Sequence, residues 1–392
     1  MHHYRIVTLI LLSFACVFLS ACHEDQPASR TIFTLQVDED YFFVGDSWIF
    51  ATDQNGEVLD AKSYSKGQTI TLSTNKTVDK VNITFFNSLT GTTSFNTYAG
   101  YPTGASLRLS APLPDGEPKS GAAAFNILNY DASGLLEFSN GYRTDAKGVI
   151  AGNAFKVNLS FYNTPSDMLI TGYRADVPVY NWAKGLKDGD VVDRDFTADF
   201  EAFPHQVKLD FEGSNTAYVY ARSAGQATYL KLIDTNQLGI RRTDHPVIGY
   251  IDGFDVYQTW VQNMKPGGSV TYFKTGAPTL SFTMPSFTFS LTSREIQNLS
   301  FDFSEDYTYY SSLWYYTGTW WGITAPPGTT VTQFSIPTEI ATKYPDIDAS
   351  KFKFSGVHFT KVLDGGSYLD AVQGSLAQPP ANQEYYIFTP EF

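Results

Sequence analysis

The residues best suited to chemistry in this chain are aromatic and lie between Asp306 and Ile323, in the segment DYTYYSSLWYYTGTWWGI. Flat aromatic faces stack on the apolar faces of sugar rings, and the polar atoms of Tyr and Trp form hydrogen bonds with hydroxyl groups. The segment is therefore a candidate glycan-binding platform. Its aromatic residues are Tyr307, Tyr309, Tyr310, Trp314, Tyr315, Tyr316, Trp320 and Trp321.

Strand geometry divides this segment between two faces, because alternate residues of a strand share a face. Of the adjacent pair Trp320 and Trp321, one must point into the core and one outward, and we expect Trp320 to be the outward one. Trp314 and Tyr316 should lie together on one face. The candidate ligand-binding residues are thus Trp314, Tyr316, Trp320 and Tyr309. The alternative is ordinary core packing with cross-strand pairs on the sheet surface.

Acidic residues offer a second kind of chemistry. The segment KDGDVVDRD contains Asp188, Asp190 and Asp193, and calcium prefers such oxygen ligands in loops. The spacing does not match an EF-hand, so solvated turn carboxylates are the competing interpretation. A pair of acids could also catalyse glycoside hydrolysis if the carboxylates lay about 5–10 Å apart, a distance that sequence cannot show.

Established catalytic motifs are missing from the sequence: it has no G-x-S-x-G, H-E-x-x-H or P-loop pattern. His23, His205, His245 and His358 are far apart and share no metal-ligand spacing, so we expect surface or turn positions for them. We assign no catalytic residue and no metal or organic cofactor. An enzyme ranks below a binding protein.

The first residues predict export. Ile6 to Leu19 is an almost unbroken apolar run that follows the basic Arg5. It is shorter than the about 20 residues of a transmembrane helix but fits the apolar region of a signal peptide. We predict that residues 1–21 are a signal peptide cleaved before Cys22.

Leu19-Ser20-Ala21-Cys22 resembles the bacterial lipobox, which implies a diacylglyceryl thioether and acyl chains such as palmitate on Cys22. The following His23-Glu24-Asp25 is similar to the acidic signal that sends Bacteroidota lipoproteins to the outer face of the outer membrane. The resemblance implies that residues 22–30 are a lipidated tether on the cell surface. The alternatives are an ordinary signal peptide with a stray cysteine and a merely solvated acidic tether.

Composition favours an all-β fold, because aromatic residues make up 16% of the chain and Tyr, Phe, Thr and Val favour strands. The net charge of −13 repels nucleic-acid phosphates, so nucleic acid is not an expected partner. Once residues 1–21 are removed, Cys22 is the only cysteine, which excludes a disulfide within the chain. Packing must therefore stabilise the fold.

Short alternating runs such as Ile32–Val37 and Val81–Phe85 recur between turn signals, and Asn55-Gly56 predicts a hairpin. The fold class is therefore tandem β-sandwich modules, loosely similar to carboxypeptidase-regulatory-like and immunoglobulin-like modules. The proline-rich stretch 112–121 is a predicted linker. Short helices are predicted over Ser293–Leu299 and Pro337–Tyr344. The expected modules are 31–112, 121–205, 206–290 and 291–392.

A tryptophan frame suggests internal repetition. Trp182, Trp260 and Trp321 are each followed by Gly seven residues later and by Val ten residues later. Trp48 heads a looser copy, in which Gly56 is one residue late. We interpret the frame as a strand that begins with a core Trp, a glycine turn and a return strand. The alternative is coincidence in a chain rich in Gly and Val.

Three functions remain open. The first is a surface binding protein, for glycan, that uses the 306–321 aromatics. The second is a structural or adhesive lipoprotein that contacts another envelope protein and binds no small ligand. The third is a glycosidase-like hydrolase. A membrane is the expected partner in each case, through the lipid anchor.

Overall fold

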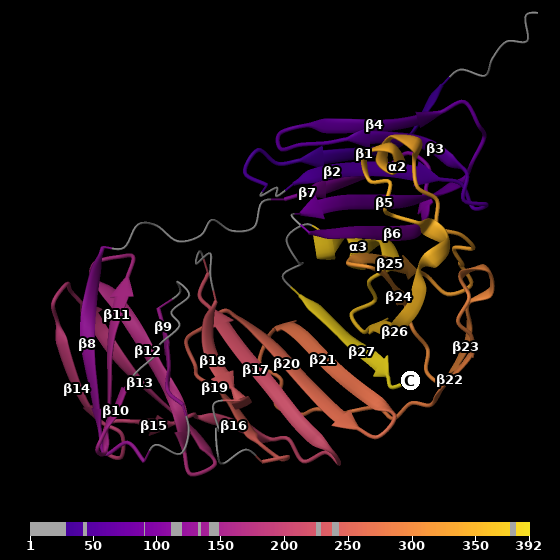
Figure 1. Cartoon of the computed structure of the whole chain (residues 1–392). Helices are drawn as coiled ribbons and strands as arrows, with labels where there is room; N and C mark the ends of the chain where they lie inside the picture. The colour runs from indigo at the N-terminus through magenta and orange to yellow at the C-terminus, as the bar shows by residue number, and fades with distance from the viewer. Residues whose placement is uncertain are drawn as a thin grey trace, which may run out of the picture.

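A computed structural model describes residues 29–41, 45–89, 91–110, 120–131, 135–140, 149–224, 229–236, 243–376 and 382–392. Most of these residues lie in β-strands, and the fold is all-β with sandwich architecture, as predicted (Figure 1). The predicted signal peptide and Cys22 lie outside the described residues, and so does most of the predicted 112–121 linker. None of the described helices is long and apolar enough to cross a membrane.

The N-terminal sandwich packs one sheet, in the order β4-β1-β7, on strands β2, β3, β5 and β6. The predicted hairpin at Asn55-Gly56 is confirmed, because β2 pairs with β3 in antiparallel fashion and Gly56 turns with a φ of 82°. The strands are β1 (Arg30–Val37), β2 (Asp46–Thr52), β3 (Val58–Ser63), β4 (Thr69–Thr74), β5 (Lys80–Leu89), β6 (Thr92–Pro102) and β7 (Ala105–Leu109).

A second sandwich places the sheet β10-β11-β8-β14 on the sheet β15-β13-β12-β9. Buried aromatic rings such as Phe125, Phe138 and Phe155 fill the space between the sheets. The strands are β8 (Gly121–Leu128), β9 (Glu137–Ser139), β10 (Val149–Ala151), β11 (Ala154–Phe161), β12 (Ser166–Arg174), β13 (Val177–Leu186), β14 (Val191–Asp195) and β15 (Glu201–Ala202).

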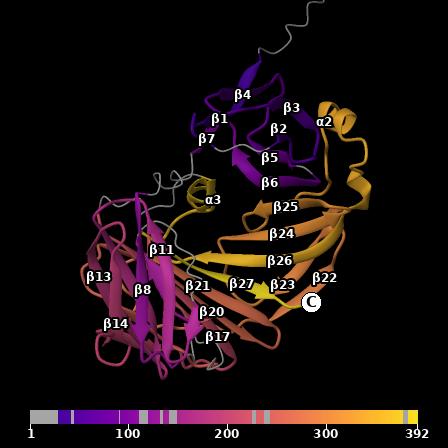
Figure 2. The ribbon, with the colours of Figure 1, turned by 60° about the vertical axis from the view of Figure 1, so that its left-hand side comes forward.

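One long sheet has the order β18-β17-β20-β21-β27-β26-β24-β25-β6-β5-β2-β3 and so includes four strands of the N-terminal sandwich. Its members outside the N-terminal sandwich are β17 (Ser214–Arg222), β18 (Leu230–Asp234), β20 (Val256–Lys265), β21 (Gly268–Gly276), β24 (Tyr309–Tyr316), β25 (Thr319–Ala325), β26 (Lys353–Val362) and β27 (Gln383–Pro390). The N-terminal sandwich and the second sandwich lie toward opposite ends of this sheet (Figures 1 and 2).

This long sheet joins segments that we predicted as separate modules. Antiparallel pairing joins β21 to β27, and parallel pairing joins β25 to β6. The predicted boundaries at 205/206 and 290/291 fall inside β16 (His205–Lys208) and β22 (Phe289–Ser293). Independent folding of the four segments stays a prediction.

Short elements cover one face of the long sheet, here termed the back face. β16 pairs with β19 (Val247–Tyr250) over the β17 and β20 region, and β22 pairs with β23 (Ser300–Phe303) over the β24 and β26 region. The opposite face, here termed the front face, carries the sheet β4-β1-β7 at one end, and there it also carries α3 (Tyr368–Leu376).

The observed helices agree with the helices predicted from the sequence only in part. Helix α2 (Thr338–Lys343) confirms the prediction over Pro337–Tyr344, whereas Ser293–Leu299 contains only one 3-10 turn, Ile296–Asn298. Helix α3 was not predicted. The sequence pattern that could have predicted it is Ser367 followed three residues later by Asp370, which together form a capping box. In the structure the Ser367 amide donates to Asp370 Oδ2 at 2.9 Å, and the Asp370 amide donates to Ser367 Oγ at 3.2 Å.

The tryptophan frame marks turns but no common hairpin. Its glycines Gly189, Gly267 and Gly328 all have positive φ, as the turn interpretation requires. Only the Trp260 copy, and the looser Trp48 copy, are antiparallel hairpins. The Trp182 copy crosses from β13 in one sheet to β14 in the other, and Val331 of the Trp321 copy lies outside any strand.

Candidate functional site

The predicted platform residues separate onto different faces. Trp314 and Tyr316 do share one face of β24, but it is the back face, where Trp314 is only 1% exposed. The Trp314 ring lies 5.3 Å from the rings of Phe334 and Phe354, and its Nε1 donates to Ser312 Oγ at 3.0 Å. Trp314 is therefore a core residue in this structure, because the chain after β25 folds back and buries it.

The other three predicted residues have partial access to solvent. Trp320 points outward as predicted, with 39% exposure against 3% for Trp321. Its ring pairs with Tyr315 at 4.5 Å. Tyr316 is half-buried beside Phe352 on the back face, and Lys351 Nζ lies 5.7 Å from its ring. Tyr309 is half-buried on the front face.

A different group of aromatic rings gathers on the front face, on four neighbouring strands. Tyr218 of β17 pairs in register with Trp260 of β20, Trp260 with Phe273 of β21, and Phe273 with Tyr385 of β27. The rings of Tyr218 and Trp260 are 5.2 Å apart, and those of Phe273 and Tyr385 stack at 4.8 Å. We name these four residues the aromatic row.

Local sequence explains why these rings point to the front. In β17, Ala217, Val219 and Ala221 are buried on the back face and alternate with Tyr218 and Tyr220. In β20, Tyr257 and Val261 are also buried on the back face, whereas Trp260 is not. Because a strand alternates its faces, burial of the small and branched residues turns Tyr218 and Trp260 to the front. All four members of the row are half-buried, so part of each ring remains accessible.

Two adjoining pockets lie over the aromatic row. The smaller, of about 260 Å³, is lined by Tyr218, Tyr220, Gln258, Trp260 and Phe273. The larger, of about 780 Å³, shares Gln258 and Phe273 with it and continues over Tyr385 and Tyr309. Its far side is made by the Asp364–Gly366 turn and by Asp370, Ala371 and Gly374 of α3. The size of the larger pocket falls within the range usual for small-molecule sites.

The polar groups in the larger pocket are amides, phenols and two carboxylates. Asn382, Gln383 and Gln258 supply amides that can both donate and accept hydrogen bonds. Burial, followed by the neighbouring Tyr309, raises the pKa of Tyr385 to about 12, and burial also raises the pKa of Tyr309. Both phenols therefore stay protonated at neutral pH and can donate.

The two carboxylates of the larger pocket hold the backbone in place. Asp364 Oδ1 accepts from the Gly366 amide at 3.0 Å, and Asp370 Oδ2 accepts from the Ser367 amide at 2.9 Å. Hydrogen bonds from Ser367 lower the pKa of Asp370. A general acid of glycoside hydrolysis needs a raised pKa, so Asp370 shifts in the opposite direction.

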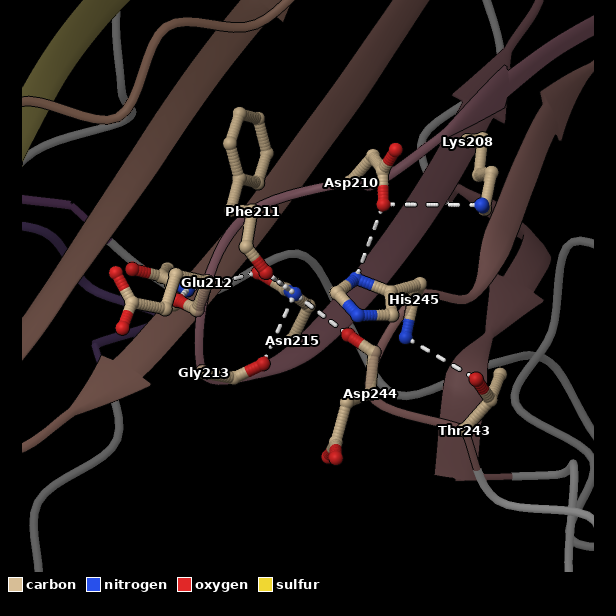
Figure 3. A network of polar contacts seen from close by, with 10 residues as sticks. Lys208, Asp210, Phe211, Glu212, Gly213, Asn215, Thr243, Asp244 and His245 are labelled. Atoms are coloured by element: carbon tan, nitrogen blue, oxygen red, sulfur yellow. Dashed lines mark hydrogen bonds and ion pairs between the residues drawn. The ribbon is translucent and has the colours of Figure 1, made fainter.

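Buried amides on the back face fix the strands under the row (Figure 3). Asn215 Nδ2 donates to the carbonyl oxygens of Phe211, at 3.0 Å, and of Asp244. Asn263 Nδ2 donates to Asn215 Oδ1 at 3.0 Å and to the Glu212 carbonyl at 2.8 Å. These bonds connect β17 and β20 to the loop before β17, so the backbone of the strands that carry Tyr218 and Trp260 is restrained.

The weak metal candidates have structural roles instead. Asp188 Oδ1 accepts from the Ala122 amide, Asp190 Oδ2 from the Lys187 amide, and Asp193 Oδ1 from Asn126 Nδ2. Hydrogen bonds from Thr197, Asn129 and Ala198 lower the pKa of the neighbouring Asp195 to about 2. Within the described ranges, no group of three or more His, Cys, Asp or Glu side chains could hold a metal ion.

The three histidines that the structure describes are separate, as expected. His205 Nε2 lies 2.8 Å from Asp252 Oδ1, and His245 Nδ1 lies 3.3 Å from Asp210 Oδ1 (Figure 3). His358 lies on β26 with an exposed side chain. His23 lies outside the described residues.

Comparison with known proteins adds no family. The sequence matches no protein-family model and no curated protein. The candidate site therefore depends on its own geometry. Sequence reasoning missed the aromatic row because Tyr218 and Tyr385 join the β20–β21 hairpin from strands elsewhere in the chain. The available signal was the alternation of Tyr218 and Tyr220 with small buried residues, which marks two rings on one face.

Proposed function

We propose that this protein binds a neutral glycan on the aromatic row. The observation that carries the proposal is four half-exposed rings on neighbouring strands under two adjoining pockets. Neighbouring strands are about 4.8 Å apart, so the row spans about 14 Å from Tyr218 to Tyr385. The accessible parts of these rings give a short oligosaccharide an aromatic surface to lie on, while the amides bind its hydroxyl groups.

The charge around the row favours an uncharged ligand. Among the residues that the structure describes, neither pocket is lined by Lys or Arg, and the larger one contains Asp364 and Asp370. Sulfated, phosphorylated or uronic glycans would meet these carboxylates and the net charge of −13 without a cationic partner. Neutral hexose or pentose polymers avoid this repulsion.

We predict that Trp260→Ala weakens glycan binding by about tenfold or more, since it removes one of the two inner rings of the row. The measurement is a glycan array on residues 23–392, followed by calorimetric titration with the best neutral ligand. Trp320→Ala is the matched control, because it removes an exposed Trp elsewhere on the same face and should change affinity by no more than about twofold. If the native protein binds no neutral glycan, or if Trp260→Ala binds normally, the proposal fails.

We also propose that the protein is anchored to the outer membrane by lipid on Cys22 and faces the cell exterior. The LSAC motif and the acidic residues after it support this proposal. We predict that Cys22→Ala abolishes incorporation of radiolabelled palmitate and moves the protein from the membrane fraction to the soluble fraction. Protease treatment of intact cells then tests orientation, because only a surface-facing chain is digested. Unchanged palmitate labelling in the variant would refute the lipid site.

A structural or adhesive role is the second candidate. It is favoured by three neighbouring apolar side chains on β24 and β25, Leu313, Tyr315 and Trp320, which are each about 40% exposed. A protein partner that covers this patch would bind the Trp320→Ala variant more weakly than the native protein and would bind the Trp260→Ala variant normally. The same pair of variants therefore separates the two functions.

A further inference from the structure

We infer that the larger pocket receives the end of a glycan chain rather than an internal stretch. This inference rests on the proposed function, because it specifies how the ligand lies on the aromatic row. The row differs at its two ends. The described residues that line the smaller pocket, at the Tyr218 end, all belong to β17, β20 and β21, which are strands of the sheet. The larger pocket has a side wall that rises from the sheet.

Helix α3 forms this wall and is firmly seated on the sheet. Tyr368 Oη donates to the Thr324 carbonyl of β25 at 2.9 Å, and its ring lies 6.0 Å from Tyr309 of β24. Tyr368 and Val372 are buried in the core of the N-terminal sandwich. The helix therefore covers the sheet beyond Tyr309, next to β25 and β6 (Figure 1).

The turn before α3 is fixed as well. Asp364 Oδ1 accepts from the Gly366 amide, and Asp364 Oδ2 accepts from the Glu384 amide of β27 at 3.3 Å. The capping box between Ser367 and Asp370 then starts the helix. The turn is thus bonded to β27, which carries Tyr385, and leads directly into the capped start of α3.

A glycan bound along the aromatic row would extend toward helix α3. The sheet order β17-β20-β21-β27-β26-β24-β25 places Tyr218, Trp260, Phe273 and Tyr385 on the path toward α3. A glycan that lies along the row from Tyr218 meets Asp370, Ala371 and Gly374 at the other end. Its last sugar lies among Asn382, Gln383 and the carboxylates, which can bind the hydroxyl groups that only a chain end exposes.

End-labelled oligosaccharides test the inference directly. The probes are maltohexaose, cellohexaose, mannohexaose and xylohexaose, each free and with a bulky fluorophore on either the reducing or the non-reducing end. The full mature chain should bind at least one free probe, should tolerate the label at one end and should lose about tenfold or more in affinity with the label at the other. Tolerance of both labels, or of neither, overturns the inference.

Substitutions on α3 give a second measurement. Ala371→Trp fills the pocket at the wall and should lower affinity for the free probe by about tenfold or more. Gln373→Trp adds the same ring to an exposed position on the same helix that does not line the pocket, and should change affinity by no more than about twofold. Thermal unfolding of both variants checks that α3 is intact.

These outcomes separate the inference from the proposed function. If Trp260→Ala loses the glycan but both labels are tolerated and Ala371→Trp binds normally, the row binds internal stretches and only the inference fails. If no probe binds and the array shows no neutral ligand, both fail together.

Discussion

Trp314→Ala should lower the free energy of unfolding by about 3–5 kcal/mol, the usual cost of truncating a buried aromatic side chain to alanine. Trp314 is 1% exposed and packs edge-on against Phe334 and Phe354. Its loss also leaves the buried Ser312 hydroxyl without the indole donor. Urea unfolding followed by near-ultraviolet circular dichroism measures the change.

The control for this prediction is Trp320→Ala, in the strand that pairs with β24. Trp320 is 39% exposed, so its removal should change stability by no more than about 0.5–1 kcal/mol. The comparison also decides between the core and ligand-contact interpretations of Trp314. A Trp314→Ala variant that is as stable as the native protein but has lost its ligand would show that Trp314 is a binding residue after all.

Gly268→Ala should destabilise the protein by about 2–5 kcal/mol, because strain and a backbone clash add at one position. Gly268 begins β21 with a φ of 141°. A Cβ there would lie 2.4 Å from the Thr389 carbonyl oxygen and 3.0 Å from Pro390 Cα, both on β27. The variant must therefore push apart β21 and β27, the junction that joins the 206–290 segment to the C-terminal strand.

Gly267→Ala is the matched control for this junction. Gly267 also has a positive φ, of 93°, but a Cβ there would meet no atom within 4 Å. It should incur only the backbone strain, about 1–3 kcal/mol. Urea unfolding of the two variants isolates the clash as their difference, and equal destabilisation would mean that β21 and β27 can separate at no cost.

The aromatic segment 306–323 shows how far strand periodicity reaches. Alternation correctly separated Trp320 from Trp321 and placed Trp314 with Tyr316, because successive side chains of a strand must point to opposite faces. It could not say which face would be covered. That depended on Phe334, Phe352 and Phe354, which belong to later segments and fold back over the Trp314 side.

The modules show the same limit at larger scale. Turn signals located many of the strands, because Gly and Asn residues with positive φ act within a few positions. The sheet order followed no local rule. Parallel pairing of β25 with β6 connects residues near 320 with residues near 95, and nothing in either strand specifies that partner.

By itself, the sequence determined the all-β class, the hairpin at Asn55-Gly56 and which rings of β24 and β25 share a face. These features depend on side-chain type and on neighbours in the chain. The tertiary structure decided which rings could meet a ligand, because exposure depends on what packs above a face. It assembled Tyr218, Trp260, Phe273 and Tyr385 into one row, and it placed α3 at the end of that row.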